Sequence, residues 1–381
     1  MTFEPTDRVG SVPPSGIRKF FELAEEYDDI ISLGVGEPDF APPWAARDAA
    51  IASLERGQTS YTANRGMAAL RERIAADASR RYGLDYDPDA AVLVTAGASE
   101  AVDLAFRAFL DEGDSVAIAQ PCYVSYVPSA RFAGAEVVDV PTRAADDFKL
   151  TREVLDASAA ATADALVMCY PNNPTGATMT RDELRPVAEF ARDNDLLVFS
   201  DEIYSELSYE HDHASIATLP GMRERTVVFN GFSKAYAMTG LRLGYALGPP
   251  QAIEAMNRIH QYTMLSAPTT AQHAAVAALE NCDEAVREMR SQYNRRRNFV
   301  LSRFEEMGID CFPAAGAFYA FPECPWDDSD AFAEALLEEE RVAVVPGNVF
   351  GAGGQGHLRV SYATGLGDLK QAMNRIESFI S

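Results

Sequence analysis

The 381-residue sequence predicts an α/β protein, with a large domain built on a mostly parallel central sheet flanked by helices and a smaller α+β domain. Three observations support this prediction. Between residues 91 and 247, short apolar runs alternate with helical stretches. These runs are apolar throughout, as expected for strands that are covered on both faces. Beyond residue 308 the pattern changes to shorter strands and helices.

The large domain, predicted to span residues 46–284, contains most of the expected elements. Its strand candidates are 91–95, 115–119, 136–140, 165–169, 196–200, 226–230 and 243–247. Helices are expected at 98–110, at 181–193 and along much of 251–307. The small domain is predicted to combine residues 1–45 with 285–381. Its expected strands are 317–321, 342–345 and 357–362, and its expected helices are 329–339 and 368–380.

Composition restricts the possible partners and compartment. The formal net charge of −24 predicts no binding to nucleic acid or to an anionic membrane, because both require a basic surface. No membrane span or signal peptide is evident, and five scattered cysteines suit reduced thiols, so we expect a cytoplasmic protein. The acidic excess, with few lysines, indicates a halophilic protein, since high salt screens repulsion between like charges.

The most informative stretch runs from Gly231 to Gly244 and has the pattern G-x-S-K-x-x-x-x-x-G-x-R-x-G. Lys234 follows an apolar strand candidate, and burial at such a position lowers an amine's pKa and favours attack on an aldehyde. Arg242 begins the next apolar strand, where a buried guanidinium requires a phosphate or carboxylate partner. A solvated lysine and a salt-bridged arginine would explain the two residues separately.

Three further motifs follow strand candidates, where open α/β sheets bind ligands. The turn Gly97, Ala98 and Ser99 opens a helix and suits an anion, although an ordinary cap by Ser99 is the better explanation of this motif taken alone. Asn173 lies in an Asn-Pro-Thr-Gly sequence, which also makes a good turn. Asp201 ends another strand and needs a cation or donors there, and Tyr204 follows it.

Together these motifs make the sequence resemble the class I/II aminotransferases, the fold-type-I family that depends on pyridoxal phosphate. The resemblance covers essentially the whole chain. It implies that Lys234 holds the cofactor as a Schiff base and is the catalytic residue. It further implies that the cofactor phosphate is bound by the following residues: Gly97, Ala98, Ser99, Ser233 and Arg242.

The resemblance also assigns residues that contact the cofactor's ring. It implies that Asp201 pairs with the pyridine nitrogen, that Asn173 and Tyr204 bond to the ring oxygen, and that Tyr123 stacks on the ring. The Asn173–Pro174 peptide bond is expected to be cis. Apart from the resemblance, Asp201 could be a capping residue, Tyr204 a packing residue and Tyr123 an ordinary loop tyrosine.

For the substrate, the resemblance implies that Arg359, Gly36 and Asn173 bind the α-carboxylate. A cross-strand salt bridge is the alternative for Arg359. Tyr61 matches a tyrosine that reaches the phosphate of a neighbouring subunit, so a homodimer with shared active sites is expected. The implied activity is transfer of an amino group from an L-α-amino acid to a 2-oxo acid such as 2-oxoglutarate. The donor is expected to be an aromatic amino acid, aspartate or any of a broad range.

Two alternatives remain open from the sequence: a C–S lyase or other β-elimination enzyme on the same site, and a non-catalytic regulator with the same fold. No metal site is predicted. His211 and His213 form an H-x-H pair that we interpret as an exposed loop. The glycine-rich stretch from Gly351 to Gly356 precedes a strand, so we expect a flexible loop there and not a dinucleotide site.

Overall fold

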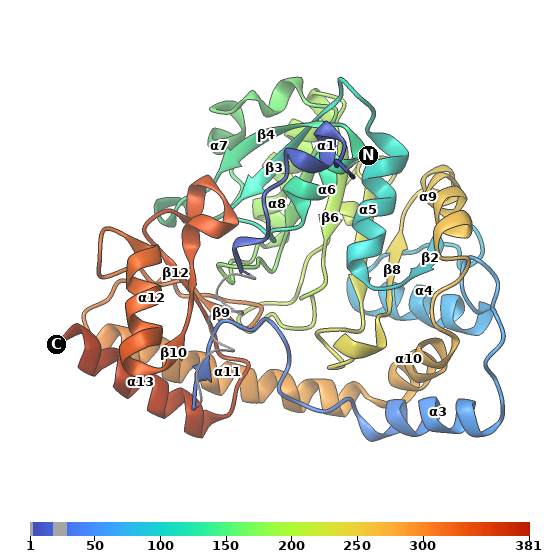
Figure 1. Cartoon of the computed structure of the whole chain (residues 1–381). Helices are drawn as coiled ribbons and strands as arrows, with labels where there is room; N and C mark the ends of the chain where they lie inside the picture. The colour runs from blue at the N-terminus through green and yellow to red at the C-terminus, as the bar shows by residue number, and fades with distance from the viewer. Residues whose placement is uncertain (1–2, 18–28) are drawn as a thin grey trace.

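The computed structural model describes residues 3–17 and 29–381. Within them, seven strands form a central sheet in the spatial order β2-β8-β7-β6-β5-β3-β4, seen in the upper half of Figure 1. The strands are β2 (Val92–Thr95), β3 (Ser115–Gln120), β4 (Glu136–Pro141), β5 (Ala165–Cys169), β6 (Leu197–Asp201), β7 (Thr226–Gly231) and β8 (Gly244–Leu247). All seven predicted strands are therefore confirmed, and no end differs by more than one residue.

Only β8 runs against its neighbours in this sheet: it pairs antiparallel with β2 and with β7, whereas β7, β6, β5, β3 and β4 pair in parallel. The mostly parallel sheet is thus confirmed. The inner strands β5 and β7 are buried along their whole length, which explains their continuous apolar runs. Because the parallel strands share one direction, their carboxyl ends meet at one edge and place Asp201 beside the end of β7.

Helices cover both faces of the sheet (Figure 1). Their bounds in the large domain are α3 (Trp44–Glu55), α4 (Ala68–Tyr82), α5 (Ala98–Phe109), α6 (Tyr126–Ala133), α7 (Arg152–Asp156), α8 (Arg181–Asp193), α9 (Pro250–Thr263) and α10 (Thr269–Asn281). On one face α5, α6 and α9 contribute Phe106, Tyr126 and Ile253 to one cluster. On the other, α8 contributes Leu184 and Val187. A capping box between Thr180 and Glu183 fixes the start of α8.

The long helix α11 (Asp283–Glu306) leads from the large sheet to the smaller unit at the lower left of Figure 1. That unit contains β9 (Tyr319–Ala320), α12 (Ser329–Glu340), β10 (Val342–Ala343), β11 (Val345–Pro346), β12 (Leu358–Ser361) and α13 (Leu366–Ile380). The N-terminal strand β1 (Ile31–Ser32) pairs in parallel with β10. This pairing supports our proposed division into 46–284 and 1–45 with 285–381, of which residues 1–2 and 18–28 lie outside the described residues.

One predicted strand, residues 342–345, is wrong as a single element. The chain bends at Val344, so that β10 pairs with β1 while β11 pairs antiparallel with β12 in a different sheet. Both halves are buried and apolar, which is why the sequence reads as one strand. The strand predicted at 317–321 is likewise reduced to β9.

The glycine-rich segment from Gly351 to Gly356 packs against neighbouring backbone and does not form an open loop. The short 3-10 turns η5 (Gly347–Phe350) and η6 (Ala352–Gly354) lie against the end of β3, where the backbone N–H of Ala352 donates to Gln120 Oε1 over 2.8 Å. A methyl group added at Gly353 would lie 2.5 Å from the carbonyl oxygen of Thr142. The glycines here therefore serve close packing between backbones.

We expect Gly353→Ala to lower the free energy of unfolding by about 1–3 kcal/mol, because the methyl group must displace backbone atoms. Urea unfolding monitored by circular dichroism measures this loss. Gly367→Ala is the matched control, since a methyl group there meets nothing within 4 Å and the residue lies in α13. An equal loss in both variants would contradict the packing argument.

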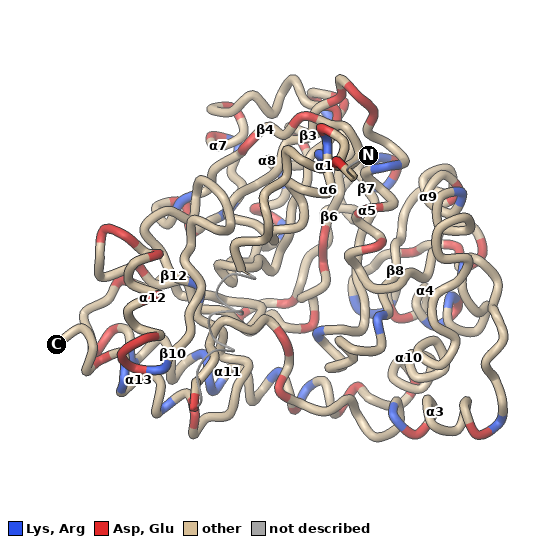
Figure 2. Tube along the Cα trace, in the orientation of Figure 1, with Lys and Arg blue, Asp and Glu red and all other residues tan. Residues whose placement is uncertain are grey.

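Acidic residues are spread along the chain over the whole molecule, as the red segments of the trace in Figure 2 show. Many are paired with arginine on the surface, for example Asp103 with Arg107, but the formal charge remains −24. No helix in the described part of the chain is long and apolar enough to cross a membrane. The five cysteines, all of them in described segments, are free thiols.

Candidate active site

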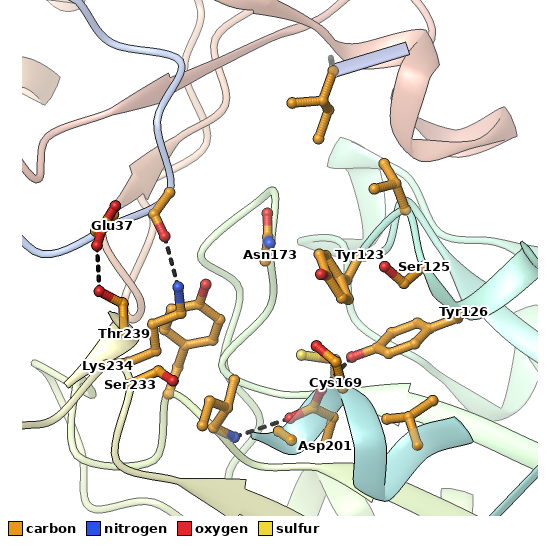
Figure 3. A pocket seen from close by; sticks show the side chains of 18 of the residues that line it. Glu37, Tyr123, Ser125, Tyr126, Cys169, Asn173, Asp201, Ser233, Lys234 and Thr239 are labelled. Atoms are coloured by element: carbon orange, nitrogen blue, oxygen red, sulfur yellow. Dashed lines mark hydrogen bonds between the residues drawn. The ribbon is translucent and has the colours of Figure 1, made fainter. Parts of the chain in front are cut away.

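A cavity of about 610 Å³ lies at the carboxyl ends of the parallel strands, between the large sheet and the smaller unit (Figure 3). Its wall brings together nearly all of the residues singled out from the sequence. Those in the wall are Gly36, Ala98, Ser99, Tyr123, Asn173, Asp201, Tyr204, Ser233, Lys234, Arg242 and Arg359. Gly97 adjoins the wall beside Arg242, and Tyr61 lies outside it.

Lys234 follows β7, and its ammonium group points into the cavity (Figure 3). Its Nζ donates to the carbonyl oxygen of Gly36 over 2.6 Å and lies 5.6 Å from the ring centre of Phe318. Burial, reinforced by the positive charge of Arg359, lowers the pKa of Lys234 to about 8. A substantial fraction of this amine is therefore unprotonated, and nucleophilic, near neutral pH.

Asp201 ends β6 and is 5% exposed. Its Oδ2 accepts the hydroxyl hydrogen of Tyr126 over 2.6 Å, and its Oδ1 accepts the backbone N–H of Ile203 over 3.1 Å. Burial raises the pKa of this carboxyl to about 6 despite these two donors. Because burial makes ionisation of this carboxyl unfavourable, a positively charged partner in the cavity would stabilise the ionised form.

The two asparagines of the 170–176 turn have different tasks. Asn172 holds the turn together, since its Oδ1 accepts from the backbone N–H and the hydroxyl of Thr175. Asn173 faces the cavity, where its Oδ1 accepts from Arg359 Nη1 over 3.0 Å. The Asn173–Pro174 bond is cis, as expected, and the turn closes with Gly176 at a φ of 72°.

Arg359, on β12, is 3% exposed and is stacked between two rings. Its guanidinium carbon lies 4.6 Å from the ring centre of Tyr319 and 4.8 Å from that of Phe350. Nη2 donates to the carbonyl oxygen of Gly34 over 2.5 Å, whereas Nε is buried with no hydrogen-bond partner in the described structure. No described carboxylate pairs with this cation, and the strands beside β12 contain none, so the alternative of a cross-strand salt bridge is wrong.

The start of α5 forms another corner of the cavity. Its N-cap is Gly97, with φ of 90° and no side-chain cap, so the alternative of a cap by Ser99 is wrong. A methyl group on Gly97 would lie 2.7 Å from Arg242 Nη2, which shows how closely the guanidinium approaches this turn. An uncapped helix N-terminus beside a guanidinium is suited to a phosphate.

Arg242 itself differs from the expectation of a buried residue inside a strand. It lies just before β8, at a φ of 52°, and its side chain is exposed in the single chain. Its Nη1 donates to the carbonyl oxygen of Thr239 over 2.9 Å, which aims the group across the cavity mouth. The apolar residues after Arg242 made it look like part of the strand.

Two tyrosines in the wall were not identified from the sequence as site residues. Tyr126 contacts Asp201 as described, and Tyr319 on β9 shares a 3.0 Å hydroxyl contact with Tyr204. The hydroxyl of Tyr319 also lies where a side chain at Gly36 would be, at 2.3 Å from the added carbon. Their only sequence signal was proximity to recognised motifs, because each is one tyrosine among 15.

The interpretation of His211 and His213 as an exposed loop is wrong for His213. Its side chain is 5% exposed, and its Nε2 lies 2.8 Å from Glu202 Oε2. Glu202, which follows Asp201, is a buried carboxylate and requires donors, which His213 and Ser215 supply. The described part of the chain contains no group of three or more ligating side chains that could hold a metal ion.

The fold and the cavity define an α/β enzyme with a nucleophilic lysine, an anion-binding helix start and a buried arginine. Residues 28–376 match the family model described as aminotransferase class I and II. The chain belongs to this family, whose members depend on pyridoxal phosphate, and it is a transaminase.

Three relatives illustrate the similarity. The chain is 41% identical to the aromatic-amino-acid aminotransferase 2 of Thermococcus litoralis, over 98% of each chain. It is also 41% identical to an aspartate aminotransferase of Pyrococcus abyssi, again over 98% of each chain. The crystal structure of an aromatic aminotransferase from Pyrococcus horikoshii superposes with a TM-score of 0.90 at 42% identity, covering 95% of this chain and 98% of that one.

Proposed function

We propose that the cavity binds pyridoxal phosphate and catalyses amino-group transfer from an L-amino acid with an uncharged side chain to a 2-oxo acid. The observation that carries this proposal is the meeting, in one cavity, of a lysine with a lowered pKa and a buried arginine that has an unpartnered donor. The cofactor, when bound, supplies the electron sink for deprotonation at the substrate's α-carbon.

The residues of the wall fit the cofactor at both of its ends. Gly97, Ala98 and Ser99, at the uncapped start of α5, would bind the phosphate together with Ser233 and Arg242. Asp201 would hold a proton on the ring nitrogen, because pairing with a cation offsets the cost of its burial. Asn173 and Tyr204 would bond to the ring oxygen, and Tyr123 would stack on the ring.

Arg359 would bind the substrate's α-carboxylate. Two of its nitrogens already donate to Asn173 and Gly34, which fixes the plane of the guanidinium, and Nε is left to donate to an incoming anion. With the carboxylate so held and Gly36 alongside, Lys234 would remove the α-proton and return it to the cofactor. Its lowered pKa suits both steps near neutral pH.

The side chain of the donor is expected to be apolar or aromatic. In the described part of the wall the cations are Lys234, Arg242 and Arg359, and each has another proposed partner. The wall also includes apolar side chains such as Ile17 and Val35, together with the carboxylate of Glu37. A second carboxylate would therefore lose its hydration without gaining a cation.

The proposal is tested by adding amino acids, one at a time and without a 2-oxo acid, to protein loaded with pyridoxal phosphate. Loss of the cofactor's visible absorbance measures the first half-reaction, and 2-oxoglutarate should restore it. We expect phenylalanine and leucine to react at least about tenfold faster than aspartate, the equivalent of about 1.4 kcal/mol. Fastest reaction with aspartate would contradict the uncharged-donor proposal, whereas no absorbance change with any donor would contradict transamination.

The active enzyme is proposed to be a homodimer. Tyr61 is 81% exposed in the single chain, although large aromatic side chains are usually covered. Trp44 at 65% and Tyr262 at 87% are also exposed, and such apolar groups indicate an interaction site. In this arrangement Tyr61 would reach the phosphate in the other subunit. Light scattering at micromolar concentration measures the mass, and a monomer that retains full activity would contradict the proposal.

The protein is also proposed to be adapted to high salt and to a reducing compartment such as the cytoplasm. The net charge of −24 and the five free cysteines support this. We expect the midpoint of thermal unfolding to rise between about 0.1 M and 2 M KCl, because salt screens repulsion between the carboxylates. A midpoint that falls or stays constant over this range would contradict the adaptation.

A further inference from the structure

A buried pair of side chains lies directly behind the first turn of α5, outside the wall of the cavity. Glu100 is the third residue of the helix, and its Oε1 lies 2.7 Å from Nδ1 of His260 on α9. The other oxygen, Oε2, accepts the backbone N–H of Ala96 in the turn before the helix. Neither Glu100 nor His260 has been given a part in the proposed reaction.

The environment of this pair makes the contact specific. His260 is completely buried, and the Glu100 side chain is 13% exposed. In the tautomer that carries its hydrogen on Nδ1, His260 donates this hydrogen bond and the Glu100 carboxylate accepts it. Nε2 of His260 is buried without a partner in the described structure, so Glu100 provides the only hydrogen bond that the ring makes there.

The pair acts on the turn that is proposed to bind the phosphate. Ala96 precedes Gly97, and the hydroxyl of Thr95 donates to the carbonyl oxygen of Gly97 over 2.9 Å. Glu100, which lies outside the cavity wall, therefore binds the turn through Ala96, whereas Ala98 and Ser99 line the cavity. Because the helix has no side-chain cap at Gly97, the backbone entering α5 is anchored by this carboxylate and by the Thr95 hydroxyl.

We propose that Glu100 and His260 are positioning residues for the cofactor phosphate, an inference that rests on the proposed function. Glu100 occupies the N–H of Ala96 and sets the turn so that the first N–H groups of α5 converge on the phosphate. His260 orients the carboxylate and offsets its negative charge, which would otherwise repel the phosphate. The alternative explanation is that this pair of residues only stabilises the fold.

The test compares pyridoxal phosphate with pyridoxal, which lacks the phosphate but can bond to the same lysine. Dissociation constants for both are measured by titrating cofactor-free protein and following the visible absorbance. We expect Glu100→Ala to weaken pyridoxal phosphate binding by about tenfold or more, as for loss of hydrogen bonds to a charged group. Binding of pyridoxal should change by less than about twofold, and Glu100→Gln should restore part of the phosphate-dependent affinity.

Two further variants complete the design. His260→Leu fills the buried position with an apolar side chain and removes the donor. It should also lower the preference for pyridoxal phosphate over pyridoxal. Glu153→Ala is the matched control, because Glu153 lies in the first turn of α7, away from the cavity. It should leave both constants unchanged. If Glu100→Ala does not fold, His260→Leu and Glu100→Gln decide the question.

The outcomes separate the two proposals. If the unaltered protein binds neither compound, or binds them equally, the proposed function fails. If it prefers pyridoxal phosphate and the Glu100 and His260 variants keep that preference in full, the positioning inference is overturned. Equal weakening for both compounds would also overturn it, since a purely structural brace would act on the whole cavity.

Discussion

Lys234→Ala is expected to leave a folded protein that no longer transaminates. In the proposed function, Lys234 would contribute the nitrogen that holds the cofactor and the base that moves the α-proton, and neither neighbour of its Nζ could replace it. Loss of the proton-transfer step alone is expected to cost about 10²–10⁴-fold in kcat, and loss of covalent attachment adds to this. Single-turnover kinetics with phenylalanine, together with the visible spectrum of the bound cofactor, measure both effects.

The fold should tolerate this substitution. Burial lowers the pKa of Lys234 to about 8, so the protonated amine is disfavoured where it lies and its removal costs little stability. Lys149→Ala is the matched control, because that lysine pairs with Glu183 away from the cavity. Activity within a factor of ten of the unaltered enzyme in Lys234→Ala would rule out the assigned role.

Asp201→Asn is expected to produce the second large effect. Asparagine has nearly the same shape: its amide oxygen can accept the backbone N–H of Ile203, and its NH2 group can donate to the hydroxyl oxygen of Tyr126. It cannot hold a proton on the ring nitrogen, because it carries no charge. Loss of one member of a buried charged pair costs about 2–5 kcal/mol, which corresponds to a fall in kcat of roughly 30-fold to several thousand-fold.

The same substitution should stabilise the protein without its cofactor. Burial raises the pKa of Asp201 from 3.8 to about 6, so ionisation is harder in the folded state. A raised pKa favours the folded state only while the group is protonated, and this contribution is lost as the pH rises from about 4 to about 6. The unaltered apoprotein should therefore be less stable than Asp201→Asn by something of the order of 3 kcal/mol at pH 7.

Denaturant unfolding of both apoproteins between pH 4 and pH 7 measures this difference, which should be small at pH 4 and largest above pH 6. Adding pyridoxal phosphate should favour the unaltered protein again, because the ring nitrogen then partners the carboxylate. Asp182→Asn, at an exposed position, is the control and should show no such pH dependence. A constant difference across this pH range would show that Asp201 ionises normally in the fold.

Much of the cofactor side of the cavity could be predicted from the sequence, for a physical reason. Lys234, Asn173 and Asp201 each belong to a short motif at the end of a strand. The apolar run of that strand is visible in the sequence and shows where the motif lies. Parallel strands place such groups at one edge without further information. The strand positions and the mostly parallel sheet were predictable on the same basis.

The rest depends on contacts between distant segments, which local patterns do not encode. Tyr126 meets Asp201 and Tyr319 meets Tyr204 only after the chain has folded. The burial of His213 depends on Glu202, at the end of another strand. The split at Val344 depends on which partner strand each half finds, although both halves are equally apolar.

The pairing of β1 with β10, and of Arg359 with Gly34, also has a consequence for synthesis of the chain. The residues proposed to hold the cofactor within one subunit have all been made once residue 242 is reached. The substrate end requires residues 34 and 359, which are 325 positions apart, and these can meet only near the completion of translation. During synthesis, therefore, the chain can assemble its cofactor side before it can bind an amino acid.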